Sequence, residues 1–167
     1  DRLGGNPGLN CFEFATEMHG ISENDILCKK KRLFSCVNGF VHLIHIKMVL
    51  LCVDDDDDDL DIFEEAIKTI SVSYQCVRAY NGKDAIKLLK SLTPDHIFLD
   101  INMPGMDGVE VLKYMRTEMH IVVPIVIIST SLPDNHNLEK IGASKCITKP
   151  ASFKGLCKIL NSYFLEA

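Results

Sequence analysis

From residue 48 onward, short runs of apolar residues alternate with stretches in which apolar residues recur every three or four positions. The run Met-Val-Leu-Leu-Cys-Val at residues 48–53 is short, continuous and rich in β-formers, which is typical of a buried strand. Similar runs predict strands at residues 74–79, 97–99, 122–128 and 146–148. Helical spacing predicts helices with apolar faces between residues 60–70, 85–92, 109–115, 138–141 and 153–164, the last of them capped by Ser152.

Five strands that alternate with five helices predict an α/β domain, a doubly wound five-stranded parallel sheet with helices on both faces. Crossovers in such sheets are right-handed. Ligands bind beyond the carboxyl ends of the strands, at the point where the strand order switches. The polar residues that follow each strand are therefore the candidates for chemistry.

The first 46 residues do not share this pattern. We expect residues 1–46 to form an irregular N-terminal extension and residues 47–167 to form the domain, and a truncation that begins at Met48 tests this boundary. A basic run, Lys-Lys-Lys-Arg, occupies residues 29–32. Such a run is typical of a solvated patch, with a nucleic-acid or membrane contact as the alternative.

Composition narrows the class of protein. The chain has 167 residues, of which 47% are hydrophobic and 25% charged, as expected for a globular domain. No apolar run is long enough to span a bilayer, and the net charge of -5 disfavours direct nucleic-acid binding. The seven cysteines form no CxxC pair, which disfavours a zinc site and favours a reducing cytoplasm over a disulfide framework.

Polar residues follow four of the predicted strands. Asp54 and Asp55 follow the first strand, Asp100 the third, Ser129 closes the fourth, and Lys149 follows the fifth. Because the carboxyl ends of parallel strands meet at one edge of the sheet, these side chains gather there. Taken one at a time, each residue has a simpler interpretation as a helix cap, a turn or part of a solvated loop. The prediction of a functional site therefore depends on their joint placement at the strand ends.

This set of residues suits phosphoryl transfer. Carboxylates that converge at one edge repel each other, and their oxygens suit a hard divalent cation such as Mg²⁺. A carboxylate can act as a nucleophile and form an acyl phosphate. Lys149 offers a compact positive charge, and the hydroxyl of Ser129 can donate to a phosphoryl oxygen. Catalysis of such a transfer is mainly positioning and charge stabilisation.

Four segments resemble the successive motifs of response-regulator receiver domains: VLLCVDDDDDDLDIFEEAI, HIFLDINMPGMDGVEVL, VPIVIISTS and GASKCITKP. The resemblance covers residues 47–164, and it is greatest to stand-alone receivers because no output domain follows Phe164. It implies a (βα)5 flavodoxin-like fold with strand order 2-1-3-4-5. It also implies a cytoplasmic, bacterial two-component signalling protein that is not an enzyme but assists its own phosphorylation and dephosphorylation.

The resemblance implies a role for each site residue. Asp100 is the phosphoacceptor. Asp55 and Asp100 bind Mg²⁺ directly, the backbone carbonyl of Asn102 is a third ligand, and Asp54 acts through a bound water. Ser129 moves to hydrogen-bond the phosphoryl group.

The remaining implications concern Lys149 and the partners. Lys149 pairs with the phosphoryl group, and the peptide bond between Lys149 and Pro150 is expected to be cis. The phosphodonor is a phosphohistidine on a sensor histidine kinase or phosphotransfer protein, and the downstream target is an unknown protein. Direct nucleic-acid binding and membrane insertion are not expected, and whether the domain forms a homodimer stays open.

Two positions depart from the family pattern. Cys146 stands where the family usually has Tyr or Phe, three residues before the lysine, which puts aromatic coupling in doubt. Ser131, two residues after Ser129, carries no acid or amide to position an attacking water, so we expect a phosphate that is not short-lived. The segment between Ser129 and Lys149 is short, which predicts an abbreviated helix.

Three other functions compete with this interpretation. A receiver that is never phosphorylated and acts as a protein-binding module is disfavoured by the intact site residues. An Asp-nucleophile phosphohydrolase of the haloacid-dehalogenase kind has a second Asp two residues after the nucleophile, where this chain has Asn102. A nucleotide-binding domain is disfavoured because no glycine-rich phosphate-binding loop follows the first strand.

Overall fold

The computed structural model describes residues 32–37, 40–45, 47–70, 73–132 and 135–166, in two units, residues 1–47 and 48–167. The first unit contains an antiparallel pair of strands, β1 (Arg32–Val37) and β2 (Phe40–His45), with Arg32 opposite His45. The basic run at residues 29–32 lies outside the residues whose side chains are described.

This hairpin differs from the irregular extension expected for residues 1–46. Its strand sequences, RLFSCV and FVHLIH, are rich in aromatic and β-branched residues, which favour strands. An Asn-Gly pair separates them in the sequence, and this pair is a strong hairpin signal. This local turn signal is present in the sequence although no strand or helical period persists for long in this region.

The second unit contains a five-stranded parallel sheet in the order β4-β3-β5-β6-β7. Numbered within this unit, the order is 2-1-3-4-5, so the predicted doubly wound α/β fold is confirmed. The strands are β3 (Met48–Val53), β4 (Tyr74–Ala79), β5 (His96–Leu99), β6 (Ile125–Ser129) and β7 (Lys145–Thr148). The helices are α3 (Asp57–Ile70), α4 (Gly82–Leu89), α5 (Gly108–Thr117), α6 (Asn135–Ile141) and α7 (Phe153–Glu166).

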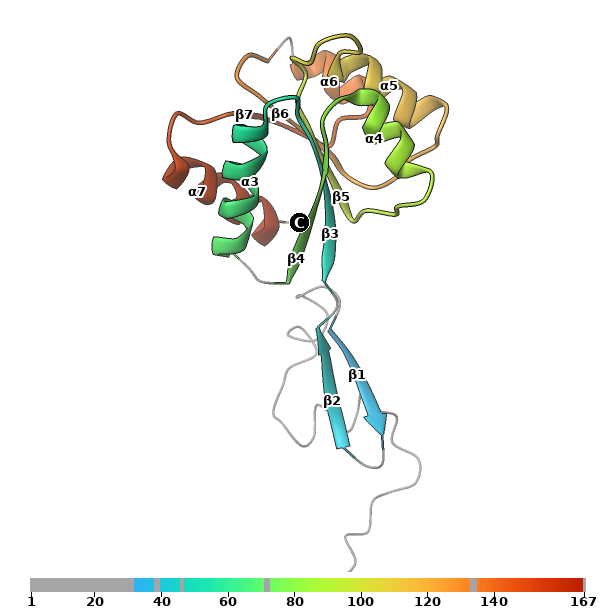
Figure 1. The fold of residues 1–167 in the computed structure, drawn as a ribbon, viewed down its shortest axis with the longest axis vertical. Coiled ribbons are helices and arrows are strands. Elements are labelled where there is room, and N and C mark those ends of the chain that lie inside the picture. The colour runs from blue at the N-terminus through green and yellow to red at the C-terminus, as the bar shows by residue number, and fades with distance from the viewer. Residues whose placement is uncertain (1–31, 38–39, 46, 71–72, 133–134, 167) are drawn as a thin grey trace, which may run out of the picture. The chain divides into compact units, whose positions relative to one another are not determined.

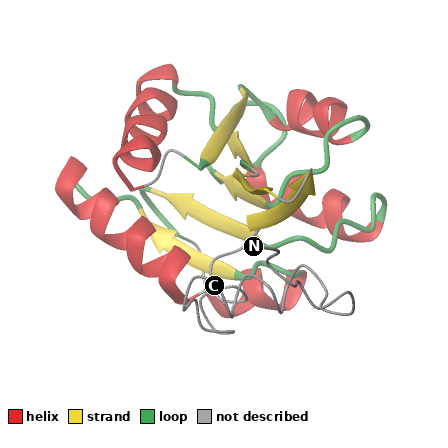
Figure 2. Ribbon diagram, turned by 90° about the horizontal axis from the view of Figure 1, so that it is seen from below, coloured by secondary structure: helices red, strands yellow, loops and turns green. Residues whose placement is uncertain are grey.

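Helices cover both faces of the sheet (Figures 1 and 2). α3 and α7 pack on one face, and α4, α5 and α6 pack on the other. Each face has its own apolar cluster: Leu50 of β3 belongs to the α3 and α7 side, and its neighbour Leu51 belongs to the opposite side. Both leucines are fully buried, which explains why this strand is a continuous apolar run.

Local capping fixes where helices begin. The side chain of Asp107 accepts a hydrogen bond of 2.8 Å from the backbone N–H of Glu110 at the start of α5. The hydroxyl of Ser152 accepts one of 3.2 Å from the backbone N–H of Gly155, so the predicted cap of α7 is confirmed. The predicted short helix before β7 is also confirmed, because α6 has seven residues.

The fourth strand of the sheet begins later than the sequence predicted. β6 starts at Ile125, whereas the apolar run starts at Val122, a residue that is 90% exposed. The guanidinium of Arg116 donates to the backbone carbonyls of Ile121 and Val123, so these carbonyls are satisfied without a neighbouring strand.

Among the described residues, no helix combines the length and apolar character that crossing a bilayer requires.

Candidate functional site

The carboxyl ends of four strands position the predicted site. The backbone N–H of Asp100, directly after β5, donates to the carbonyl of Val53 at 2.9 Å. The backbone N–H of Lys149, directly after β7, donates to the carbonyl of Ser129 at 2.8 Å. These bonds extend the sheet ladder by one step beyond each strand, which brings the side chains of both residues to one edge.

Lys149 is the centre of the charge network at this edge. Its Nζ atom lies 2.6 Å from Oδ2 of Asp54, 2.6 Å from Oδ2 of Asp59 and 3.3 Å from Oδ2 of Asp100. An ammonium has three N–H donors, so these three carboxylates account for all of them. Burial alone lowers the pKa of Lys149, but the hydrogen bonds to Asp54 and Asp59 outweigh burial and hold the pKa above its ordinary value.

The two oxygens of Asp100 have different surroundings. Oδ1 accepts hydrogen bonds from the backbone N–H groups of Ile101 at 2.7 Å and Asn102 at 3.3 Å. Oδ2 faces the ammonium of Lys149. The side chain is therefore fixed in one orientation although the residue is buried.

Asp54 is buried beside Asp100. Burial raises the pKa of Asp54, and the negative charge of Asp100 adds to that rise. The hydrogen bonds from Lys149 and from the backbone N–H of Asp56 act in the opposite direction without cancelling it. Additional positive charge at this edge would therefore stabilise the ionised form of Asp54.

Asp54, Asp55 and Asp100 fit a divalent cation. One carboxylate oxygen from each lies within 4.8 Å of the others, and Asp55 is exposed. Opposite ligands of a hard cation are about 4–5 Å apart, since each metal–oxygen bond is about 2.0–2.6 Å long. An all-oxygen set with an open side toward solvent suits a cation that keeps part of its hydration shell.

The side chain of Asn102 joins two serines. Its Nδ2 atom donates to the Oγ of Ser129 at 2.8 Å and to the Oγ of Ser131 at 3.2 Å. Ser129 is fully buried at the end of β6. From the sequence, only the backbone carbonyl of Asn102 has an expected role, because a side-chain bridge between two loops depends on tertiary structure.

The loop after Asp100 needs glycine at two places. Gly105 has φ +86°, a conformation that other residues rarely adopt. A Cβ atom on Gly108 would lie 2.1 Å from the carbonyl oxygen of Asp100 and 2.7 Å from the Cα of Ile101. The backbone of α5 thus packs directly against the backbone that carries Asp100, which explains the sequence Met-Pro-Gly-Met-Asp-Gly at residues 103–108.

Two expectations change in the structure. The described residues contain no cis peptide bond, so the prediction of a cis bond between Lys149 and Pro150 is wrong for this structure, where the bond has the trans form that X–Pro bonds favour by default. A run of aspartates is typically a solvated loop, so the sequence gives Asp59 no role at this site, yet its carboxylate contacts Lys149. The turn of α3 directs Asp59, and not its neighbours, toward Lys149. Because residues 54–59 are all aspartates, the sequence does not show which of them faces the site.

Cys146 lies in β7, where it is half-buried against the apolar cluster under α4, α5 and α6. Burial raises the pKa of its thiol, with a further contribution from the charge of Glu139. The position is therefore occupied by a small, neutral packing residue rather than by a ring.

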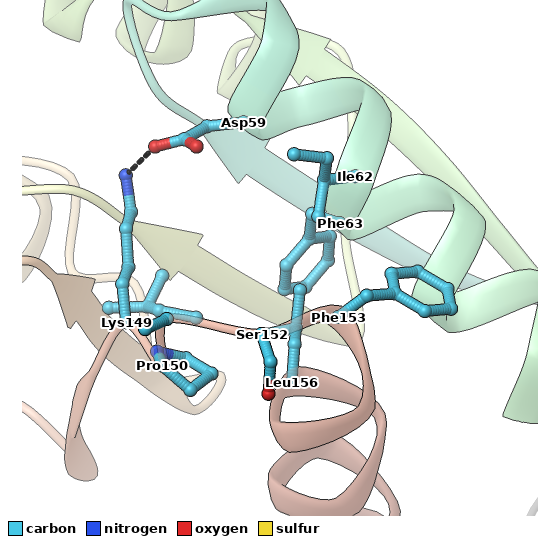
Figure 3. Close-up of a pocket in the computed structure, with 10 residues that line it drawn as sticks. Asp59, Ile62, Phe63, Lys149, Pro150, Ser152, Phe153 and Leu156 are labelled. Atoms are coloured by element: carbon cyan, nitrogen blue, oxygen red, sulfur yellow. Dashed lines mark hydrogen bonds and ion pairs between the residues drawn. The ribbon is translucent and has the colours of Figure 1, made fainter.

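A hollow of about 180 Å³ adjoins the site between the first turns of α3 and α7 (Figure 3). Asp59 and Lys149 form its charged side. Ile62 and Phe153 line it as well, and they are 44% and 41% exposed. An exposed apolar surface thus lies immediately beside the charged groups.

The chain is similar in sequence and in fold to proteins of one family. The family model described as the response regulator receiver domain matches residues 50–161. The polar-differentiation response regulator DivK of Brucella anthropi is 27% identical over 121 residues, which cover 71% of this chain and 97% of DivK. The crystal structure of the phosphorylated cyanobacterial phytochrome response regulator RcpA matches with a TM-score of 0.64 and 27% identity, over 70% of this chain and 91% of RcpA. The Mn²⁺-bound form of response regulator Rcp1 matches with a TM-score of 0.63 and 26% identity, over 72% of this chain and 96% of Rcp1.

Proposed function

Because the chain belongs to the response regulator receiver domain family of two-component systems, we propose that Asp100 accepts a phosphoryl group from a phosphohistidine donor. One carboxylate oxygen of Asp100 forms a bond to phosphorus. The bond from phosphorus to the donor's imidazole nitrogen breaks, and that nitrogen keeps the electron pair. The observation that supports this most is the fixed, buried carboxylate of Asp100 with the ammonium of Lys149 at 3.3 Å.

Lys149 and Ser129 stabilise the new charge. The ammonium of Lys149 pairs with a phosphoryl oxygen, and the hydroxyl of Ser129 donates to another. Ser129 already lies at the same edge, where its Oγ accepts a hydrogen bond from Nδ2 of Asn102, so its O–H group can donate to a phosphoryl oxygen without losing this partner. Movement of this hydroxyl toward the phosphoryl group is the local event from which the conformational switch starts.

The residues fit Mg²⁺. Asp55, Asp100 and the backbone carbonyl of Asn102 would hold it directly, and Asp54 would act through a water molecule, because its Oδ2 atom already accepts a hydrogen bond from Lys149. When bound, the cation supplies positive charge that offsets the charge of the phosphoryl group. Rcp1, one of the similar proteins, has a Mn²⁺-bound form, so a cation of this kind suits the fold.

The donor protein is a sensor histidine kinase or a phosphotransfer protein, and it docks beside the hollow next to Lys149. The imidazole must reach Asp100, so the donor covers the surface around the site during transfer. The exposed side chains of Ile62 and Phe153 give that surface an apolar part, which suits a protein partner. A protein of unknown identity receives the signal afterwards.

The protein acts in the cytoplasm. The described cysteines are free thiols, which agrees with a reducing compartment: Cys52, Cys76, Cys146 and Cys157. The functional domain comprises residues 47–167, and the division of the chain into units 1–47 and 48–167 supports a boundary within one residue of this one. A truncated chain that starts at Met48 and still unfolds cooperatively supports this boundary, and one that does not fold contradicts it.

Intact mass spectrometry tests the proposed chemistry. The wild type is incubated with acetyl phosphate and Mg²⁺, alongside Asp100→Asn and the control Asp57→Asn, which changes an exposed acid of α3. One phosphoryl adduct on the wild type and the control, absent from Asp100→Asn and without Mg²⁺, supports the proposal. No adduct on the wild type favours a protein-binding module, and continuing release of phosphate over many turnovers favours a phosphohydrolase.

A further inference from the structure

We propose that Asp59 is a positioning residue that holds Lys149 while Asp100 is unphosphorylated and competes with the phosphoryl group for its ammonium. This inference rests on the proposed function. The carboxylate of Asp59 lies 2.6 Å from the ammonium (Figure 3). It is as close as the carboxylate of Asp54 and closer than that of Asp100. Asp59 is thus one of the two strongest partners of Lys149.

The backbone around Asp59 is fixed locally. The carboxylate of Asp54 accepts a hydrogen bond of 3.1 Å from the backbone N–H of Asp56. The carboxylate of Asp56 then accepts bonds from the backbone N–H groups of Asp58 at 2.9 Å and Asp59 at 3.4 Å. These turns start α3 and aim Asp59 toward Lys149, while its neighbour Asp58 is exposed.

The ammonium has no spare donor for a phosphoryl oxygen. Its three N–H groups are matched by three carboxylates, so a new partner must displace one of them. When an Asp100 oxygen bonds to phosphorus, the group on that side becomes bulkier and more negative, and it needs the ammonium more. The phosphoryl oxygens take over the N–H group that faced Oδ2 of Asp100 and draw the ammonium toward phosphorus, so that one of the other two bonds opens.

Exposure decides which bond opens. The side chain of Asp59 is 39% exposed, whereas that of Asp54 is 8% exposed. Water can replace the ammonium at Asp59, but Asp54 would be left as a buried carboxylate without its cation. Phosphorylation therefore breaks the ion pair between Asp59 and Lys149. This ion pair links the first turn of α3 to the end of β7.

The test compares Asp59→Asn with the control Asp58→Asn, which removes the same charge from the next residue. Both are phosphorylated with acetyl phosphate and Mg²⁺, and the fraction of adduct on Asp100 is measured against acetyl phosphate concentration. We expect Asp59→Asn to need roughly three- to fivefold less acetyl phosphate for half-maximal phosphorylation, the scale of a partly exposed ion pair, and Asp58→Asn to stay near the wild type. Asp59→Glu should restore most of the wild-type value.

A second readout does not depend on metal or phosphate. The NMR signal of the Lys149 side chain, assigned by its loss in Lys149→Met, should shift in metal-free Asp59→Asn and not in Asp58→Asn. Equal phosphorylation curves for the two Asn variants, or an unshifted Lys149 signal in Asp59→Asn, overturns the competition. A wild type that takes up no phosphoryl group contradicts the proposed function instead, and the NMR comparison then still decides whether Asp59 holds Lys149.

Discussion

The ammonium of Lys149 lies 3.3 Å from Oδ2 of Asp100, although 48 residues separate the two in the sequence. Each residue directly follows a strand of the parallel sheet, so the topology alone brings them to the same edge. The contact is longer than the two other bonds of this ammonium, which leaves Asp100 only partly neutralised. As the proposed acceptor, Asp100 thus retains negative charge for a cation and for attack on phosphorus.

Lys149→Met should lower the free energy of unfolding at neutral pH by about 2–4 kcal/mol without divalent metal, because the buried carboxylates of Asp54 and Asp100 lose their cation. Urea denaturation measures this change. Lys154→Met, which alters an exposed lysine of α7, is the control and should have little effect. Equal losses for the two variants would contradict the central position of Lys149.

Divalent cations should stabilise the folded protein through Asp55. Added Mg²⁺ or Mn²⁺ raises the free energy of unfolding as the cation binds the native state, and Asp55→Asn should weaken binding roughly tenfold or more. Isothermal titration calorimetry measures the affinity, with Asp57→Asn as the control for loss of one exposed acid. Unchanged affinity in Asp55→Asn would place the cation elsewhere.

The strand ends could be predicted from the sequence because short apolar runs and the residues directly after them carry the information. Asp54, Asp100, Ser129 and Lys149 all follow from that rule. Asp59 does not, because six consecutive aspartates give no sign of which carboxylate the helix turns toward the lysine.

Long-range backbone contacts also escaped prediction. The start of β6 depends on the guanidinium of Arg116. This group donates hydrogen bonds to backbone carbonyls that precede the strand and to the carbonyl of Gly142, which follows α6. No periodic pattern in the sequence indicates which backbone carbonyl groups such a long side chain contacts. The bridge from the Asn102 side chain to the hydroxyls of Ser129 and Ser131 likewise joins segments that are distant in the sequence, although it links side chains rather than backbone.

The phosphoryl adduct should persist for longer than seconds once the donor is removed. The hydroxyl of Ser131 accepts a hydrogen bond from Asn102, and it has no acidic group with which to activate water. Intact mass at successive times after desalting measures the lifetime, and Ser131→Ala should leave it nearly unchanged. Loss of the adduct within seconds, or a much longer lifetime in Ser131→Ala, would give the hydroxyl a role in hydrolysis.

Gly108→Ala should destabilise the domain by about 2–3 kcal/mol and slow phosphorylation, since its Cβ would overlap the backbone carbonyl of Asp100 and backbone cannot move aside cheaply. Gly105→Ala is the comparison: it has φ +86° but no atom within 4 Å of its Cβ, so it should cost about 1 kcal/mol. Chemical denaturation and the acetyl phosphate assay measure both effects. A milder effect at Gly108 than at Gly105 would argue against close packing beneath the acceptor.

Alkaline pH should unfold the domain partly through Tyr163, whose phenol is buried and lies 2.7 Å from Nδ1 of His96. Burial raises the pKa of Tyr163 from 10.0 to about 12, so folding favours the neutral phenol. The raised pKa contributes stability that is complete below about pH 10 and is lost as the pH rises toward about 12, by up to about 2 kcal/mol. Tyr163→Phe has no phenol to ionise, so its free energy of unfolding should fall less over this interval, although its stability near neutral pH is lower. Denaturation at several alkaline pH values, with Tyr114→Phe as the exposed control, measures the difference, and parallel losses in all three proteins would exclude Tyr163 as the titrating group.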